Sequence, residues 1–406
     1  MRWSPLFWFL LTACTVARPA PTPADNPHAA EPIGTVRQMY DGRLPPDLAA
    51  TTFRNIDRLF PSRVIARGTA VTPLIPAPAP MPDVTCTVGD STYTLERYML
   101  LNRVSGLLVL KEGRVLLERY ALGATPDTRW MSMSIAKSVT STLIGVALHD
   151  GRIRSLDDTV TRYVPSLRGS AYDVVTVRQV LMMGSGIQWN ETYTDSASDR
   201  RRLLEAQIAQ RPGIAMALMA ALPRAAAAGT RFNYSTGETL VASEVVRGAV
   251  GMSASQYLSQ KLWQPLGMEH HATWWLDSPD GHEIGGSGIM ATLRDYARFG
   301  EFIRRDGMIG TRRLLPEGWV QNAGAPKQYG TRTEQYGYMW WPVESAKGSI
   351  HDGAFSAQGI FGQYLYINRT QRLVIAQLGA QTHPTLGNVV DPFACFAAIA
   401  TAIRAS

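Results

Sequence analysis

The chain has 406 residues, of which 45% are hydrophobic, and it carries a formal net charge of +7. This is enough apolar material for one or two buried cores. The positive charge is spread over single arginines and short clusters such as 199–202, without a basic arm or an aromatic-interleaved basic patch, so nucleic acid is not expected as a partner. Neither Cys-x-x-Cys nor His-Glu-x-x-His spacing occurs, and we expect neither a metal site nor a cofactor.

The N-terminal segment has the pattern of an export signal. A positively charged start precedes an apolar run over 3–11 that is too short to span a membrane. The letters LTAC at 11–14 resemble the lipobox of bacterial lipoproteins, which would make Cys14 the lipidated first residue and attach the protein to a membrane. Ordinary cleavage just after the apolar run is the alternative. We expect a signal peptide over 1–14, a flexible Pro/Ala-rich tether over 15–32, and a periplasmic or extracellular location.

Two further cysteines, Cys86 and Cys395, lie far apart in the chain. In an oxidising compartment they would pair and join the N-terminal part to the C-terminal helix. Two free buried thiols are the alternative at this stage.

The remaining chain divides by its periodicity. Residues 33–95 contain a second proline cluster and are expected to form an N-terminal extension over a main domain at 96–406. Apolar runs around the turns KEGR and NRTQ predict one hairpin over 105–123 and another over 361–379. A helix is expected between these hairpins over 134–149, ending at a glycine.

Between the two hairpins the pattern is mainly helical. The main domain is therefore expected to have an α/β part at 96–155 and 285–406, with an all-helical part at 156–284 inserted in it. The predicted fold class is α/β (α+β), an antiparallel sheet flanked by helices, with the active site at the seam between the two parts. The oligomeric state stays open.

The predicted helix over 134–149 contains Lys137, one of only five lysines among the 40 basic residues. The helix is apolar nearly all round and is expected to be buried, where an ammonium without a partner is costly. Ser134 lies three positions earlier and shares a helix face with the lysine. A buried lysine can lose its proton near neutral pH, so this Ser-x-x-Lys pair suits a serine nucleophile with a lysine base. A capping serine and a lysine that extends to solvent are the alternative.

The segment FNYSTGE supplies a tyrosine, Tyr234, followed by Ser235, one hundred residues after the Ser-x-x-Lys pair. A tyrosine near a lysine can carry a proton from the serine to the leaving group if its pKa is lowered. An ordinary buried tyrosine is the alternative reading.

In this order, Ser134-x-x-Lys137, Tyr234-Ser235 and a glycine-bearing strand near the C-terminus resemble the serine β-lactamase and penicillin-binding-protein superfamily. The segments LMMGSGIQWNE (181–191), WQPLGME (263–269) and GGSGIMATLRDYARFG (285–300) are similar to its class C β-lactamase branch. Within that branch, FRNIDRLFPSRVI and AQGIFGQYLYI look like the 6-aminohexanoate-dimer hydrolases and their esterase relatives. The resemblance covers residue 50 to the end and implies a β-lactamase/transpeptidase-like fold.

The resemblance also implies roles for single residues. Ser134 would be acylated, Lys137 would be its base, and Tyr234 would relay the proton to the leaving group. The oxyanion hole would pair the backbone N–H groups of Ser134 and Ile360. Further substrate contacts are expected from Tyr193, which stands where the 6-aminohexanoate-dimer hydrolases have a second tyrosine, and from Trp189, Ser235 and Gly359.

The last motif strand departs from the superfamily pattern of Lys/His-Thr-Gly. The preferred match is Ala357-Gln358-Gly359, which provides no cation, and the competing match is His351-Asp352-Gly353. Because that cation helps to hold the carboxylate of a β-lactam, its absence argues against β-lactam hydrolysis. The sequence therefore predicts a serine hydrolase acting on small esters or amides. A β-lactamase or D-alanyl-D-alanine peptidase and a catalytically idle wall-binding protein are the alternatives, and the natural substrate stays open.

Overall fold

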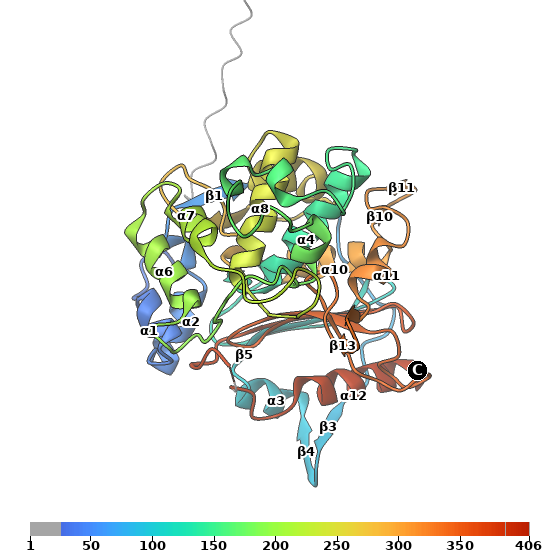
Figure 1. Cartoon of the computed structure of the whole chain (residues 1–406). Helices are drawn as coiled ribbons and strands as arrows, with labels where there is room; N and C mark the ends of the chain where they lie inside the picture. The colour runs from blue at the N-terminus through green and yellow to red at the C-terminus, as the bar shows by residue number, and fades with distance from the viewer. Residues whose placement is uncertain (1–25, 386, 406) are drawn as a thin grey trace, which may run out of the picture.

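The computed structural model describes residues 26–385 and 387–405, so the expected signal peptide and Cys14 lie outside the described residues. Seven strands of the described chain form the central sheet (Figure 1). Their spatial order is β14 (Trp341–Pro342), β15 (Phe355–Gly359), β16 (Gln363–Asn368), β17 (Leu373–Gly379), β5 (Val104–Lys111), β6 (Arg114–Tyr120) and β2 (Ile75–Pro76). Every neighbouring pair is antiparallel except the pair of β2 and β6.

Both predicted hairpins are present in this sheet. Strand β5 pairs with β6, and β16 pairs with β17. The centre of β5 is buried on both faces because side chains alternate along a strand, so Leu108 and Leu110 belong to one core while Leu107 and Val109 belong to the other. The predicted mixed α/β fold class is confirmed.

Helices cover both faces of the sheet (Figure 1). On one face, α3 (Leu95–Leu101) and α12 (Pro392–Ala405) pack with the hairpin of β3 (Thr85–Val88) and β4 (Ser91–Thr94). On the opposite face, α10 (Leu293–Arg304) packs against β5, β16 and β17, and α4 (Ile135–His149) lies against β15 and β16. The helix predicted over 134–149 is α4, which begins one residue later than expected, at Ile135.

The helical part packs against α4 and holds most of the remaining helices of the described chain. Among the described residues these helical segments are η2 (Val160–Arg162), η3 (Pro165–Leu167), α5 (Val177–Leu181), α6 (Asp199–Ala209), α7 (Ile214–Ala221), α8 (Thr236–Val250), α9 (Ala254–Leu258) and the π-helical η4 (Ser259–Trp263). Helix α8 packs along α4, which buries nearly the whole circumference of α4. The remaining hairpins are β10 (Met308–Ile309) with β11 (Arg312–Arg313) and β12 (Lys327–Tyr329) with β13 (Arg332–Glu334), and α11 is Trp319–Ala323.

The expectation of an all-helical segment over 156–284 is wrong at its C-terminal end. Residues Ala272–Trp275 form strand β8, which pairs with β1 (Ser62–Ile65) and β9 (Ile289–Thr292). Strand β7 (Arg129–Met131) completes this second, four-stranded sheet. All four residues of β8 are buried, and its threonine and two tryptophans are residue types that favour a strand.

The tether expected over 15–32 ends earlier than predicted. Glu31 accepts two hydrogen bonds from the guanidinium of Arg54, at 2.6 and 2.7 Å, and the Asn26 amide donates to the Asn55 side chain at 2.8 Å. Arg54 is only 7% exposed, and the carboxylate of Glu31 compensates the cost of burying its charge. Residues 26–32 therefore pack onto the extension formed by α1 (Val36–Tyr40), α2 (Pro46–Phe53) and η1 (Ile56–Arg58).

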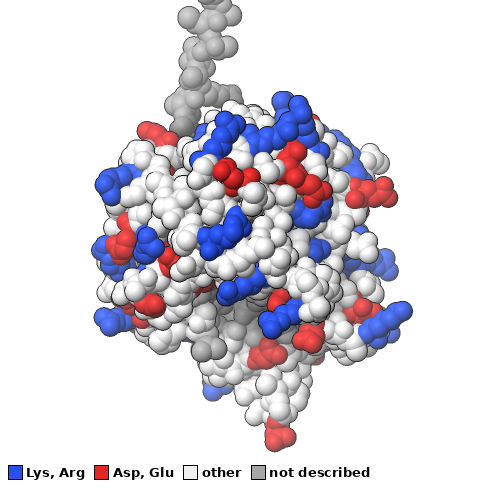
Figure 2. Space-filling model, viewed as in Figure 1, with Lys and Arg blue, Asp and Glu red and all other residues white. Residues whose placement is uncertain are grey.

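The described surface mixes charges of both signs. Figure 2 shows Lys and Arg side chains interspersed with Asp and Glu over one face of the molecule. In the part of the chain that the structure describes, no helix has the length and hydropathy needed to cross a membrane.

Cys86 on β3 and Cys395 on α12 form a disulfide, which decides between the two alternatives left open by the sequence. Both residues are fully buried, and the bond joins positions 309 residues apart. It fixes the β3–β4 hairpin to the C-terminal helix.

Removal of this disulfide should destabilise the protein by about 2–5 kcal/mol, because closing so long a loop restricts the unfolded chain. We expect reductant to lower the thermal midpoint of the wild type by about 2–6 °C, because the unfolding entropy of a chain of this length is large. The double variant Cys86→Ser/Cys395→Ser serves as control, since its midpoint should not respond to reductant. An unchanged wild-type midpoint in reductant would contradict the expectation.

Candidate active site

Ser134 lies at the turn between β7 and α4. The residue before it, Met133, has a φ of 41°, in the left-handed region that side chains other than glycine rarely adopt. Such a conformation costs roughly 1–3 kcal/mol and tends to occur at functional sites. Ser134 is 8% exposed and its hydroxyl does not cap the helix, so the hydroxyl remains available to other groups.

The Lys137 amine is enclosed by three oxygen atoms. Its Nζ lies 3.0 Å from Ser134 Oγ, 3.0 Å from Thr236 Oγ1 and 3.0 Å from the carbonyl oxygen of Gly286. No carboxylate of the described residues contacts this amine directly, and the side chain is 1% exposed. Burial lowers the pKa of Lys137 to about 7, an effect that the negative charge of Glu191 opposes and the positive charge of Arg200 reinforces.

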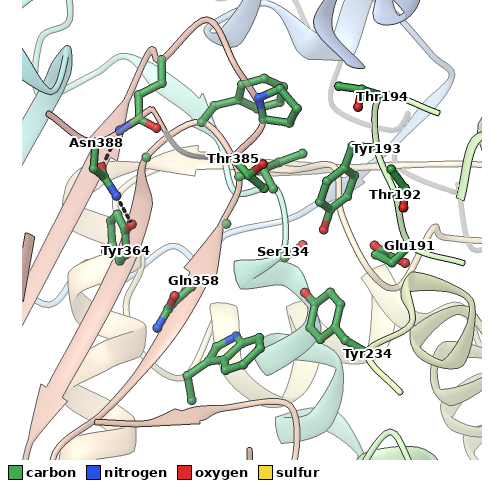
Figure 3. A pocket seen from close by; sticks show the side chains of 17 residues that line it. Ser134, Glu191, Thr192, Tyr193, Thr194, Tyr234, Gln358, Tyr364, Thr385 and Asn388 are labelled. Carbon is green, nitrogen blue, oxygen red and sulfur yellow. Dashed lines mark hydrogen bonds between the residues drawn. The ribbon is translucent and has the colours of Figure 1, made fainter. Parts of the chain in front are cut away.

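Tyr234 faces the same hydroxyl from the loop before α8 (Figure 3). Its hydroxyl points toward Ser134, and Lys137 Nζ lies 5.1 Å from the centre of its ring. Tyr336 and Trp341 hold the ring at centroid distances of 5.8 and 5.4 Å. Burial raises the pKa of Tyr234, and the negative charge of the nearby Glu191 raises it further, so the condition of a lowered pKa is not met in this state. Tyr234 is therefore a neutral phenol in this state.

A cavity of about 620 Å³ opens onto Ser134 and Tyr234, with the Lys137 amine behind Ser134 outside its lining (Figure 3). It is walled by aromatic rings and uncharged polar side chains, with Glu191 as the one acidic residue of the described lining. The lining comprises Ser134, Glu191, Thr192, Tyr193, Thr194, Tyr234, Trp341, Gln358, Gly359, Ile360, Phe361, Gly362, Tyr364, Gln381, Pro384, Thr385 and Asn388. It includes no Lys, Arg or His among the described residues.

Three of the further residues predicted for the site line this cavity, namely Tyr193, Gly359 and Ile360. A Cβ atom on Gly359 would lie 3.1 Å from the Ser134 nitrogen, so the end of β15 runs directly beside the start of α4. The next residue after Ile360, Phe361, has a φ of 68° and turns the chain back into β16.

The structure distinguishes the two matches for the last motif strand. Gln358 and Gly359 line the cavity, whereas His351 donates to or accepts from the Tyr366 hydroxyl at 2.9 Å and packs against Phe393 of α12. His351 therefore belongs to the opposite face of the sheet. The match at 357–359 is the one beside Ser134, and it carries no cation.

Two predicted substrate contacts, Trp189 and Ser235, do not line the described cavity. Trp189 is 8% exposed, and its ring nitrogen donates to Glu191 at 2.5 Å. Ser235 is the N-cap of α8, where its hydroxyl accepts from the Glu238 backbone N–H at 3.1 Å. Both side chains support the wall of the site from behind, because the first belongs to the core and the second satisfies a helix end.

Sequence reasoning missed the groups that hold the lysine. Thr236 and Gly286 contact the amine, and Glu191 contacts Thr236 through two hydrogen bonds, of 2.9 Å to its nitrogen and 2.5 Å to its hydroxyl. Thr236 follows Tyr234-Ser235 directly, and Glu191 ends the segment LMMGSGIQWNE. Their adjacency to recognised motifs was the available signal, but neither spacing nor periodicity indicated what they touch.

Within the described residues, no group of three or more His, Cys, Asp or Glu is arranged to hold a metal ion. The site chemistry that the geometry can perform is carried by a hydroxyl, an amine, a phenol and backbone N–H groups.

An antiparallel sheet with a helical region above it, and a Ser-x-x-Lys pair buried where the two meet, defines the β-lactamase and transpeptidase class of fold. The chain belongs to the Beta-lactamase family, whose model matches residues 102–396. It is 29% identical over 347 residues to the 6-aminohexanoate-dimer hydrolase of Paenarthrobacter ureafaciens, covering 82% of this chain and 85% of that one.

Solved structures share the fold at lower identity. A provisionally assigned 6-aminohexanoate-dimer hydrolase from Bacillus anthracis superposes with a TM-score of 0.76 at 19% identity, covering 89% of this chain and 94% of its own. A class C β-lactamase gives a TM-score of 0.54 at 19% identity, covering 77% and 94% of the two chains. A family VIII carboxylesterase gives 0.55 at 17% identity, covering 75% and 92%. The chain is thus a member of a serine hydrolase family that includes β-lactamases and esterases.

Gly359→Ala should damage the contact between β15 and α4. The added methyl group would lie 2.5 Å from the Ser132 carbonyl oxygen and 3.1 Å from the Ser134 nitrogen, and these backbone atoms cannot move aside cheaply. We expect a fluorophosphonate to label Ser134 at least about tenfold more slowly in this variant than in the wild type. Gly68→Ala is the matched control, because its methyl group would meet neighbours only at 3.4–3.5 Å. Equal labelling of the two variants would contradict the expected geometry.

Proposed function

We propose that this chain is a serine hydrolase that cleaves small esters or amides through an acyl-enzyme on Ser134. The observation that carries the proposal is the contact of 3.0 Å between Ser134 Oγ and Lys137 Nζ inside a buried site. A lysine whose pKa is about 7 is neutral in a large fraction of molecules at physiological pH and can then act as a base.

The proposed reaction begins when Ser134 Oγ attacks the substrate carbonyl carbon and gives its proton to the Lys137 amine. The backbone N–H groups of Ser134 and Ile360 stabilise the negative charge on the carbonyl oxygen. The Tyr234 hydroxyl passes a proton to the departing alcohol or amine and regains one from Lys137. Water then attacks the acyl-enzyme, and the same groups return the proton to Ser134 Oγ as the acid leaves.

The cavity supports a substrate without a carboxylate next to the reacting bond. Its described lining contains Glu191 and no cationic side chain, so a carboxylate placed there would meet a like charge and no partner. Two relatives of this fold are named as a 6-aminohexanoate-dimer hydrolase and a carboxylesterase. These features favour ester or amide cleavage over the β-lactamase and peptidase alternatives.

We also propose export through residues 1–14, with lipidation of Cys14 as the means of membrane attachment. The disulfide of Cys86 with Cys395 supports an oxidising location, since such bonds persist mainly outside the cytoplasm.

The proposal is tested by intact mass analysis of the purified protein after treatment with a fluorophosphonate. We expect one adduct on the wild type and none on Ser134→Ala. A panel of p-nitrophenyl esters, an acyl anilide and the β-lactam nitrocefin follows, with kcat/KM for nitrocefin at least about 100-fold below the best ester. Comparable nitrocefin turnover would favour the β-lactamase alternative. The absence of an adduct on the wild type would favour the idle wall-binding protein.

The base is tested separately by its pH dependence. Lys137 must be unprotonated to accept the serine proton, so the labelling rate should rise with pH through about 7 and level off above it. Lys137→Arg should reduce the rate by at least about 10³-fold, because arginine keeps its proton. Lys347→Arg, at an exposed position, is the control. A rate that is flat between pH 6 and 8, or substantial activity of Lys137→Arg, would remove Lys137 as the base.

A further inference from the structure

Glu191 lines the cavity, but its carboxylate oxygens already accept hydrogen bonds from neighbouring groups of the protein. It accepts hydrogen bonds from Trp189 Nε1 at 2.5 Å, from the Thr236 backbone nitrogen at 2.9 Å and from Thr236 Oγ1 at 2.5 Å. An ionised carboxylate can only accept hydrogen bonds. The hydroxyl hydrogen of Thr236 must therefore point to Glu191.

The direction of this hydrogen fixes the next contact. Since Thr236 Oγ1 gives its hydrogen to Glu191, it can only accept from Lys137 Nζ, 3.0 Å away. The carbonyl oxygen of Gly286 is also an acceptor, at 3.0 Å. A neutral amine has two hydrogens, and these two acceptors use both. The remaining tetrahedral position of Nζ carries the lone pair and is left for Ser134 Oγ, at 3.0 Å.

We propose that Glu191 is a positioning residue of this site: through the Thr236 hydroxyl it sets the orientation of the Lys137 amine and aims its lone pair at Ser134. The inference rests on the proposed function, because it concerns how the same base is held. Among the described residues, Glu191 makes no hydrogen bond to Ser134 or Lys137, so its hydrogen-bonded influence on the amine passes through Thr236.

Glu191 also acts on the lysine through its charge. It raises the pKa of Lys137 against the stronger effect of burial, while Arg200 on α6 lowers that pKa. Arg200 is 3% exposed, and its guanidinium donates to the Tyr40 hydroxyl on α1. The other titratable groups that sense the Glu191 charge are phenols, and burial and this charge raise the pKa of each of them: Tyr40, Tyr193, Tyr234 and Tyr336.

The test measures the rate of Ser134 labelling by an uncharged fluorophosphonate between pH 5 and 9 in the full chain. Glu191→Gln removes the charge of the side chain and replaces one acceptor oxygen by an amide N–H₂, which would face the hydrogen-bond donors of Trp189 or Thr236. We expect the rising limb of the rate against pH to move to lower pH in this variant, since the charge that raises the pKa of Lys137 is gone. We also expect the plateau of the labelling rate to fall by about tenfold or more. Thr236→Val removes the hydroxyl at constant shape and should lower the plateau by about 10–100-fold, whereas Thr236→Ser should recover most of that loss.

Thr239→Val is the matched control, because Thr239 lies buried in the same helix and its hydroxyl has no hydrogen-bond partner in the described part of the chain. Circular dichroism melts check that each variant folds. A fall of the plateau in Glu191→Gln with an unmoved limb would assign Glu191 a merely structural role and overturn the proposal. So would Glu191→Gln and Thr236→Val rates within twofold of the wild type. The proposed function fails separately, if the wild type itself shows no Ser134-dependent labelling.

Discussion

Burial of the Lys137 amine is the constraint on which the rest of the site depends. An amine that is 1% exposed must make its polar contacts within the protein, and three different segments supply the oxygen atoms around it. Helix α4 brings Ser134, the start of α8 brings Thr236, and the segment before β9 brings the Gly286 carbonyl. The amine therefore keeps these contacts only while α8 packs along α4 and the segment before β9 stays beside them. The same burial brings the pKa of Lys137 to about 7.

The second requirement is a close approach of two backbone segments beside Ser134. Met133 and Phe361 both hold positive φ angles without being glycine, and each flanks one of the N–H groups that we propose for the oxyanion hole. Between the two segments only a glycine fits, because any side chain at Gly359 would meet the Ser132 carbonyl oxygen. The strained backbone at Met133 and Phe361 and the absence of a side chain at Gly359 together allow the end of β15 to lie beside the start of α4.

The family fold is shared by proteins described as β-lactamases and as esterases, so the fold does not decide the substrate. The residues that line the cavity differ between such proteins and can decide the substrate. In this chain the strand beside the serine reads Ala357-Gln358-Gly359, and the lining around it is aromatic or neutral apart from Glu191. Glu191 in turn is bound from behind by Trp189 and Thr236. The residues that shape the cavity and those that hold the base are therefore connected.

The sequence by itself determined what depends on near neighbours or on simple periodicity. Ser134 and Lys137 share a helix face because they are three residues apart, and the two hairpins follow from alternating apolar runs around clear turns. Tertiary structure decided the rest. The strand at 272–275 forms by pairing with Ser62–Ile65, and Glu191 contacts Thr236 across 45 residues, so both depend on segments that are distant in the chain. Such contacts are fixed by the packing of the whole domain, which no local pattern of residues encodes.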